Sequence, residues 1–170
     1  YASWQVAQML WLAEREGLPA VRITQPIYNL IARGIEQEFL PMCEALGVST
    51  VVYNPLAGGL LTGKHKGGTP TDGTRFDGNA NYQDRYWHDI NFKAVAELGE
   101  VAEAEGRSLV SLALAWLFHH TPMTCAILGA SRLEQLEANL KTLKQSAVSD
   151  DALQSCDQIW EGLRGLTPRY

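Results

Sequence analysis

The sequence lacks the features that mark several classes of protein. Its 170 residues contain no dense run of lysine and arginine, and the formal net charge is −5. This argues against a nucleic acid or an anionic membrane surface as a partner. No apolar stretch reaches the roughly 18–20 residues that a membrane-spanning helix needs, and no signal peptide is recognisable. The longest candidate, Leu109 to Phe118, instead predicts a buried helix.

Cysteine is scarce as well. The three cysteines, Cys43, Cys125 and Cys156, lie far apart in the chain. An odd number without close spacing argues against a disulfide framework and against a zinc site, so no metal ligand is predicted. We interpret them as small buried hydrophobic side chains in a reducing compartment, which predicts a cytoplasmic location.

Short apolar runs that alternate with helical patterns predict an α/β fold with a parallel sheet. Strands are expected at residues 20–25, 49–53 and 124–128, and helices at about 3–17, 35–46, 92–105, 108–119, 132–143 and 150–163. Three parallel strands cannot close a barrel, and the eight-stranded form typically needs about 250 residues. Because the chain also begins at Tyr1 within a helical pattern, we expect it to be an incomplete piece.

Three local patterns leave alternatives or carry specific expectations. Pro41 either kinks the helix at 35–46 or lies in the first turn of a shorter one. Residues 55–84 are predicted to form a long loop, functional or disordered, and too polar to be buried. The pair His119-His120 is expected to cap the dipole of its helix rather than to bind a metal.

The third predicted strand ends in a pattern that suits an anion. Gly129-Ala130-Ser131-Arg132 opens a helix, and Ser131 with Glu134 fits a capping box. Free N–H groups, the helix dipole and a guanidinium attract phosphate. Gln135 and Asn139 share a helix face and could read an adenine ring. The alternative is that Ser131 only caps the helix and that Arg132 is solvated.

The end of the second strand is open to two interpretations as well. Tyr53 could stack on a planar ring such as nicotinamide, or it could pack in the core. The run from Gly58 to Lys64 is not a P-loop, because His65 follows the lysine. Its glycines still allow the backbone to approach a diphosphate, although a flexible surface loop is the alternative.

Three strings together resemble the aldo-keto reductases, especially the branch of bacterial reductases and potassium-channel β subunits. They are Gln25-x-x-Tyr28-Asn29, the run from Tyr53 to Lys64, and Leu128-Gly129-Ala130-Ser131-x-x-x-Gln135-x-x-x-Asn139. The resemblance covers essentially all 170 residues. It implies that residues 1–170 are the C-terminal half of a (β/α)8 TIM barrel whose N-terminal half is absent.

The resemblance also implies NADP(H) as cofactor. Gln25 would bind the nicotinamide carboxamide, and Tyr53 would stack on the ring. The pyrophosphate would be lined by Asn54, Pro55, Leu56, Ala57 and Gly58, under a loop that carries Lys64 and Arg75. Gly129, Ser131 and Arg132 would hold the adenosine end with its 2′-phosphate, and Gln135 and Asn139 would meet the adenine. Tyr28-Asn29 matches the family without an assigned role.

The family's catalytic tyrosine, lysine, aspartate and histidine would all lie in the absent half, so this chain would contain no catalytic residue. The complete protein would reduce small aldehydes or ketones to alcohols with NADPH. One alternative is a non-catalytic NADP(H)-sensing subunit similar to the channel β subunits. Another is a self-sufficient half-barrel that closes its sheet by dimerising. Whether the protein forms a homo-oligomer stays open.

Overall fold

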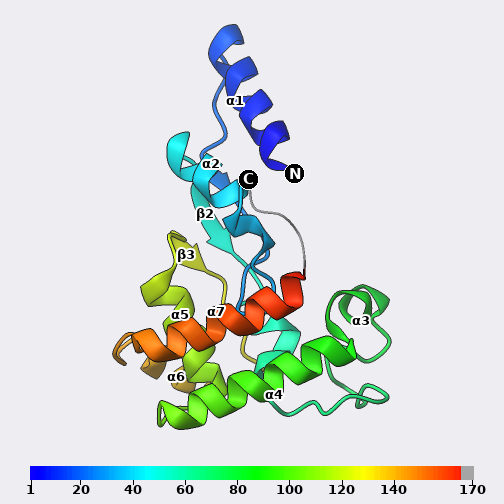
Figure 1. Ribbon diagram of the computed structural model, residues 1–170. Coiled ribbons are helices and arrows are strands. Elements are labelled where there is room, and N and C mark those ends of the chain that lie inside the picture. Colours follow the sequence, from blue (N-terminus) through cyan, green and yellow to red (C-terminus); the bar gives the residue numbers. More distant parts are fainter. Residues whose placement is uncertain (166–170) are drawn as a thin grey trace.

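A parallel three-stranded sheet lies at the centre of the computed structural model, which describes residues 1–165. The strands are β1 (Ile23–Thr24), β2 (Ser49–Val52) and β3 (Cys125–Ala126), and their order in the sheet follows their order in the chain. Ile23 pairs with Ser49, and Val51 pairs with Cys125. The predicted α/β class with a parallel sheet is therefore confirmed (Figure 1).

The two outer strands are shorter than predicted. β1 has two residues where six were expected, and pairing resumes only at the single bridge between Ile27 and Tyr53. Pro26 lies between these contacts and has no N–H to donate, although its carbonyl accepts from Tyr53 N at 3.0 Å. β1 and β3 each pair along one side only, whereas β2 is held on both sides.

Helices and turns surround the sheet. They are α1 (Ser3–Glu16), η1 (Gly34–Glu36), α2 (Phe39–Ala45), η2 (Ala57–Thr62), α3 (Ala80–Tyr86), α4 (Asp89–Ala104), α5 (Leu109–His120), α6 (Leu133–Thr142) and α7 (Asp150–Arg164), where η marks a 3-10 helix. In Figure 1, α4 and α7 lie side by side across the lower part, and α1 extends away from the other helices. The helix predicted at 35–46 is divided into η1 and α2. Pro41 lies in the first turn of α2, as one of the two alternatives predicted, because N–H groups there need no intrahelical partner.

The segment predicted as a long polar loop contains η2 at its start and the first residues of α3 at its end. Residues 63–79 form no helix or strand and are mostly exposed, as predicted, but His65 and Phe76 are buried, so the prediction that the loop is too polar to be buried is wrong for these two. Phe76 is 0% exposed and His65 is 8% exposed. The Phe76 ring lies 5.1 Å from that of His65 and 4.7 Å from that of Trp87, between centroids. Phe76 belongs to the main hydrophobic core and Trp87 packs against it, so these contacts attach the loop to that core.

The main hydrophobic core lies between the sheet and α4, α5 and α7. A second cluster, formed by Val6, Phe39, Cys43 and Val48, attaches α1 to α2. Other apolar side chains remain exposed on α1, on or directly after the edge strands, and on or directly after α6, namely Trp4, Trp11, Ile23, Ile127, Leu133, Leu136, Leu140 and Leu143. The two open sheet edges and the helices beside them fit a chain that forms only part of a barrel.

Both histidines lie in the last turn of α5, as predicted, but His120 also makes a specific contact. His120 Nε2 accepts a hydrogen bond from Val148 N at 3.0 Å. Burial and the neighbouring His119 lower the pKa of His120. An uncharged imidazole does not offset the helix dipole, so His120 instead connects α5 to the segment before α7. Within residues 1–165, no three His, Cys, Asp or Glu side chains form a metal-binding group.

The described part of the chain contains no helix that is both long and apolar enough to cross a bilayer.

Candidate functional site

The carboxyl ends of the three parallel strands lie at one edge of the sheet, where ligands bind in α/β folds. Gln25 and Tyr53 lie at adjacent ends, because Tyr53 pairs with the backbone around Pro26 and Ile27. Along β2 the buried residues are Thr50 and Val52, so Tyr53 lies on the opposite, less buried face. The Gln25 side chain is exposed.

The turn that follows β2 has an unusual backbone. Asn54 and Ala57 have φ values of +57° and +50°, and Gly58 and Gly59 have φ values of +69° and +106°. Each left-handed non-glycine residue costs roughly 1 kcal/mol, and asparagine tolerates this conformation better than most. The turn is closed by Ala57 N, which donates to Asn54 O at 2.9 Å. Pro55 is buried within it, and Leu56 packs partly against the core.

Buried side chains hold this turn in place. Asn29 Nδ2 donates to Asn54 O at 2.8 Å and contacts the Tyr86 hydroxyl at 3.2 Å. Asn29 Oδ1 accepts from Ile31 N at 3.1 Å. Asn29 therefore ties the end of β1 to the end of β2, which gives this part of the motif a structural role. Burial raises the pKa of Tyr86 to about 12, so its hydroxyl remains protonated at neutral pH.

Only one of the two polar atoms of the Asn54 side chain has a hydrogen-bond partner within residues 1–165. Its Oδ1 accepts from the Tyr82 hydroxyl at 3.1 Å, whereas its buried Nδ2 has no hydrogen-bond partner within residues 1–165. A buried N–H group without a partner costs about 1–3 kcal/mol. The amide is therefore a donor at the turn that a bound acceptor would satisfy.

Tyr82 links the turn to two arginines. Arg75 Nη1 lies 3.4 Å from the Tyr82 hydroxyl, and the guanidinium carbons of Arg75 and Arg85 lie 5.6 and 5.8 Å from the centre of its ring. Burial raises the pKa of Tyr82, but the hydrogen bond from Arg75 and the charges of both arginines outweigh burial and lower it. Lys64 is exposed just after η2.

The end of β3 differs in detail from the prediction. The N-cap of α6 is Arg132, not Ser131, and no side chain caps it, so the Ser131–Glu134 capping box is wrong. Instead Gln135 Oε1 accepts from both the N and the Oγ of Ser131, each at 3.1 Å. Gly129, Ser131, Arg132 and Gln135 are exposed, whereas Asn139 is 6% exposed. The Gln135 carboxamide thus accepts from the Ser131 backbone, which is the part that the predicted capping box gave to Glu134.

The Tyr28 side chain takes part in a separate set of contacts, although its backbone N–H donates to Tyr53 O at 3.3 Å. Its hydroxyl donates to Glu36 at 2.6 Å, and burial raises its pKa far above the usual value. Arg33 pairs with Glu36 and Asp157, both at 2.7 Å, and its guanidinium lies 5.0 Å from the centre of the Trp116 ring. This ionic cluster borders a groove of about 370 Å³ next to α2, α5 and α7.

The structure thus links Asn54, Gly58 and Arg75 through Tyr82, and it places Gln25 at the end of the strand next to the one that leads to Tyr53. Within residues 1–165, the side-chain hydrogen bonds of Ser131 and Gln135 are to each other and do not reach the turn. Sequence reasoning missed Tyr82, which lies in the segment expected to be polar and irregular. The aromatic residues at 76, 82, 86 and 87 were the signal that this segment packs.

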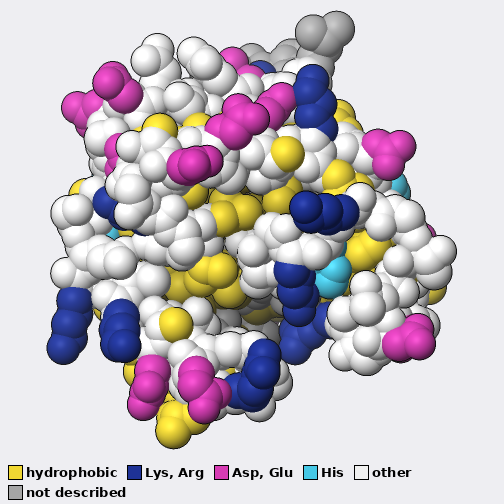
Figure 2. All heavy atoms as spheres, turned by 90° about the horizontal axis from the view of Figure 1, so that it is seen from below, with side chains coloured by type: hydrophobic (Ala, Val, Ile, Leu, Met, Phe, Trp, Pro, Cys, Tyr) yellow, Lys and Arg dark blue, Asp and Glu magenta, His cyan; other side chains and the backbone are white. Residues whose placement is uncertain are grey.

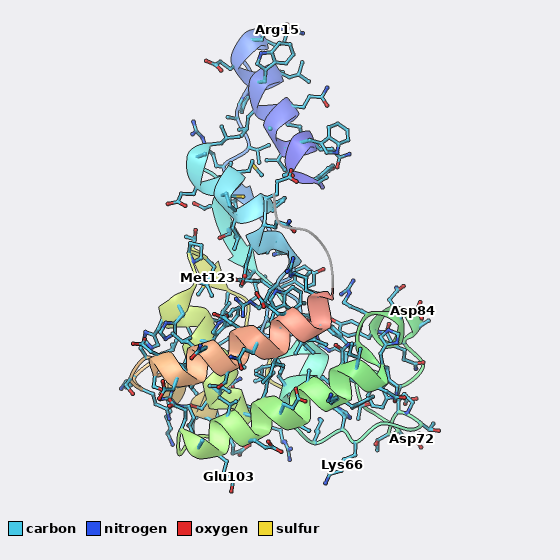
Figure 3. All side chains as sticks on the ribbon, viewed as in Figure 1. Arg15, Lys66, Asp72, Asp84, Glu103 and Met123 are labelled. Atoms are coloured by element: carbon cyan, nitrogen blue, oxygen red, sulfur yellow. The ribbon has the colours of Figure 1, made fainter. Side chains whose placement is uncertain are left out.

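Charge is unevenly distributed on the underside of the molecule. Figure 2 shows Lys and Arg side chains mainly in the middle and lower part of this face, next to exposed hydrophobic side chains, and Asp and Glu side chains across its upper part and at its margins. In Figure 3, Lys66, Asp72 and Asp84 lie on the outer side of the loop and α3, away from the sheet.

Comparison with known proteins identifies the family. Residues 1–161 match the model of the Aldo/keto reductase family. The sequence is 34% identical to aflatoxin B1 aldehyde reductase member 2 of Rattus norvegicus, a match that covers 100% of this chain and 50% of the relative. It is 34% identical to human aldo-keto reductase family 7 member A3, with 100% of this chain and 56% of the relative covered.

A bacterial relative shows the same pattern at slightly smaller coverage. L-glyceraldehyde 3-phosphate reductase of Escherichia coli (strain K12) is 33% identical over 93% of this chain and 46% of its own length. The chain spans about half the length of the curated relatives it matches. The family fold is a (β/α)8 barrel, and the three parallel strands found here account for part of one. The chain belongs to the aldo/keto reductase family.

Proposed function

We propose that this chain is the NADP(H)-binding half of a barrel that reduces small aldehydes or ketones to alcohols. The observation that carries the proposal is the strained turn after β2. It combines left-handed residues, a buried amide donor that has no partner among residues 1–165, and an arginine that contacts the same tyrosine as that side chain. Relatives with aldehyde reductase or aldo-keto reductase in their names support the reaction class.

The residues present fit a dinucleotide. The turn offers Asn54 Nδ2 as a donor and Arg75 as a cation, which suits a pyrophosphate. The end of β3 offers an exposed Arg132 at the N-terminus of α6, which suits a further phosphate. The full set that we assign to the cofactor is Gln25, Tyr53, Asn54, Pro55, Leu56, Ala57, Gly58, Lys64, Arg75, Gly129, Ser131, Arg132, Gln135 and Asn139.

The reduced cofactor supplies a hydride when it is bound. The residues of this chain bind and orient it. Tyr53, on the less buried face at the end of β2, would present a flat ring to the nicotinamide, and Gln25 at the adjacent strand end would hold the carboxamide. We assign no proton donor to this chain, so protonation of the carbonyl oxygen falls to the rest of the protein.

Arg132 provides the test, because only NADPH carries the 2′-phosphate that we assign to it. In the full-length protein, Arg132→Ala should weaken NADPH binding about 10- to 100-fold, as expected for charge-assisted hydrogen bonds, and leave NADH binding nearly unchanged. Titration by tryptophan fluorescence and calorimetry gives both dissociation constants.

The control for this experiment is Arg15→Ala. Arg15 lies near the far end of α1, where it pairs with Glu16 at 2.7 Å (Figure 3). This variant should bind both coenzymes as the unmodified protein does. A folded protein that binds neither coenzyme would refute the proposed function. An unchanged ratio of NADPH to NADH affinity in Arg132→Ala would refute the role of this residue alone.

A further inference from the structure

Tyr82 stands between the turn after β2 and the loop above it. Its hydroxyl donates to Asn54 Oδ1 at 3.1 Å and lies 3.4 Å from Arg75 Nη1. Its ring blocks the space beside Gly58, since a Cβ added there would lie 2.8 Å from two ring carbons. One side chain therefore contacts the turn twice and the loop arginine once.

The hydroxyl acts on both neighbours. By occupying Oδ1, it leaves the Asn54 amide oriented with its Nδ2 donor free for another acceptor. By accepting from Arg75, it restricts an exposed and otherwise flexible guanidinium to the vicinity of the turn. Restricting a long side chain before a ligand arrives removes part of the entropy that binding would otherwise lose.

Residues of the same loop hold Tyr82 in place. The Tyr82 ring packs against Phe76 with 6.1 Å between centroids and an interplanar angle of 84°, and Phe76 is fully buried. Asn79 caps the helix that carries Tyr82, with Oδ1 accepting from Tyr82 N at 3.4 Å. These contacts fix the ring and the backbone of Tyr82, so its hydroxyl can orient the side chains of Asn54 and Arg75.

We propose that Tyr82 is a positioning residue for the dinucleotide, which holds Asn54 and Arg75 in the arrangement that binds the pyrophosphate and thereby slows cofactor release. The inference rests on the proposed function, since it takes the turn to be the pyrophosphate site. Tyr82 touches the turn and the arginine, and it acts through them.

Tyr82→Phe in the full-length protein removes the hydroxyl and keeps the ring. NADPH release, followed by stopped-flow fluorescence after displacement, should become about five- to tenfold faster, in line with the loss of one or two hydrogen bonds. In the ligand-free protein the melting temperature should change little. Arg75→Ala should also accelerate release, and adding Tyr82→Phe to it should change the rate less than twofold further, because the two residues act as a unit.

Gln83→Met is the matched control. Gln83 is the next residue of α3, and its Nε2 donates to Phe76 O at 2.7 Å, so it also braces the loop but does not contact Asn54 or Arg75. It should leave release unchanged. Equal acceleration in Gln83→Met and Tyr82→Phe would mean that any loosening of the loop has this effect, and would overturn the proposal.

The remaining outcomes separate this inference from the proposed function. If the unmodified protein binds NADPH and Tyr82→Phe releases it at the same rate, the role of Tyr82 is wrong while the proposed function stands. If Arg75→Ala releases NADPH at the unmodified rate, the same conclusion follows without relying on the tyrosine variant. If the unmodified, folded protein binds neither NADPH nor NADH, both fail.

Discussion

Replacing Gly58 by alanine would test the packing of the turn after β2. Two costs should add. The φ of +69° places an alanine in the left-handed region, which costs about 1 kcal/mol. The new Cβ would also lie 2.8 Å from two carbons of the Tyr82 ring, well inside the usual contact distance of about 3.5–4.0 Å. Because that side chain is hydrogen-bonded to Asn54 and its ring packs against Phe76, relieving the overlap should cost about 1–3 kcal/mol more.

Gly68→Ala is the control for the backbone cost. Gly68 has a similar φ of +74°, but no atom lies within 4 Å of the Cβ position. Urea denaturation of the full-length protein should show Gly68→Ala destabilised by about 1 kcal/mol and Gly58→Ala by about 2–4 kcal/mol. When they are made in a Tyr82→Ala protein, Gly58→Ala and Gly68→Ala should lower the free energy of unfolding by similar amounts. Equal costs with Tyr82 intact would refute the close packing that we describe.

Three further predictions concern the surroundings of the turn. Asn29→Ala removes the hydrogen bonds to Ile31 N, Asn54 O and the Tyr86 hydroxyl, and should lower the free energy of unfolding by about 3 kcal/mol in urea. Burial first, and then the charge of the adjacent lysine, lowers the pKa of His65, so the folded protein binds this proton less readily than the unfolded chain. The contribution of His65 to the free energy of unfolding should therefore be fully present above about pH 6.5 and should be lost as the pH falls from there through the lowered pKa. His65→Gln should reduce this dependence of the free energy of unfolding on pH. Phe76→Ala empties a fully buried position and should cost about 3–5 kcal/mol, measured by the same denaturation, with a much smaller loss refuting its burial.

The sequence predicted those parts of the fold that depend on local patterns. The β-branched run at Thr50-Val51-Val52 predicts a buried strand, and β2 is found there. The apolar residues from Leu109 onward predict a buried helix, and α5 is buried over most of its length. Periodicity and composition determine such elements because each residue contributes through its own propensity and burial. The position of Pro41 could be narrowed to two alternatives, and packing chose between them.

The candidate site was predictable only as a set of strand ends. Gln25, Tyr53 and the glycine-rich run could be found because parallel strands bring their carboxyl ends to one edge. The contacts of Ser131 could not be predicted in this way. Glu134 and Gln135 can both accept from the Ser131 backbone and hydroxyl groups, and sequence spacing does not show which of the two does so.

Tertiary structure alone decided how the turn and the loop interact. Tyr82 is 28 residues from Asn54, and no local rule pairs them. The loop between them contains many polar residues, but its order depends on Phe76, which becomes fully buried only once the chain folds back on itself. The left-handed conformation of Asn54 persists because its carbonyl and side chain are held by Asn29 and Tyr82 from two other segments. Local strain of this kind is stable only where distant contacts compensate for it, and those contacts form only in the folded protein.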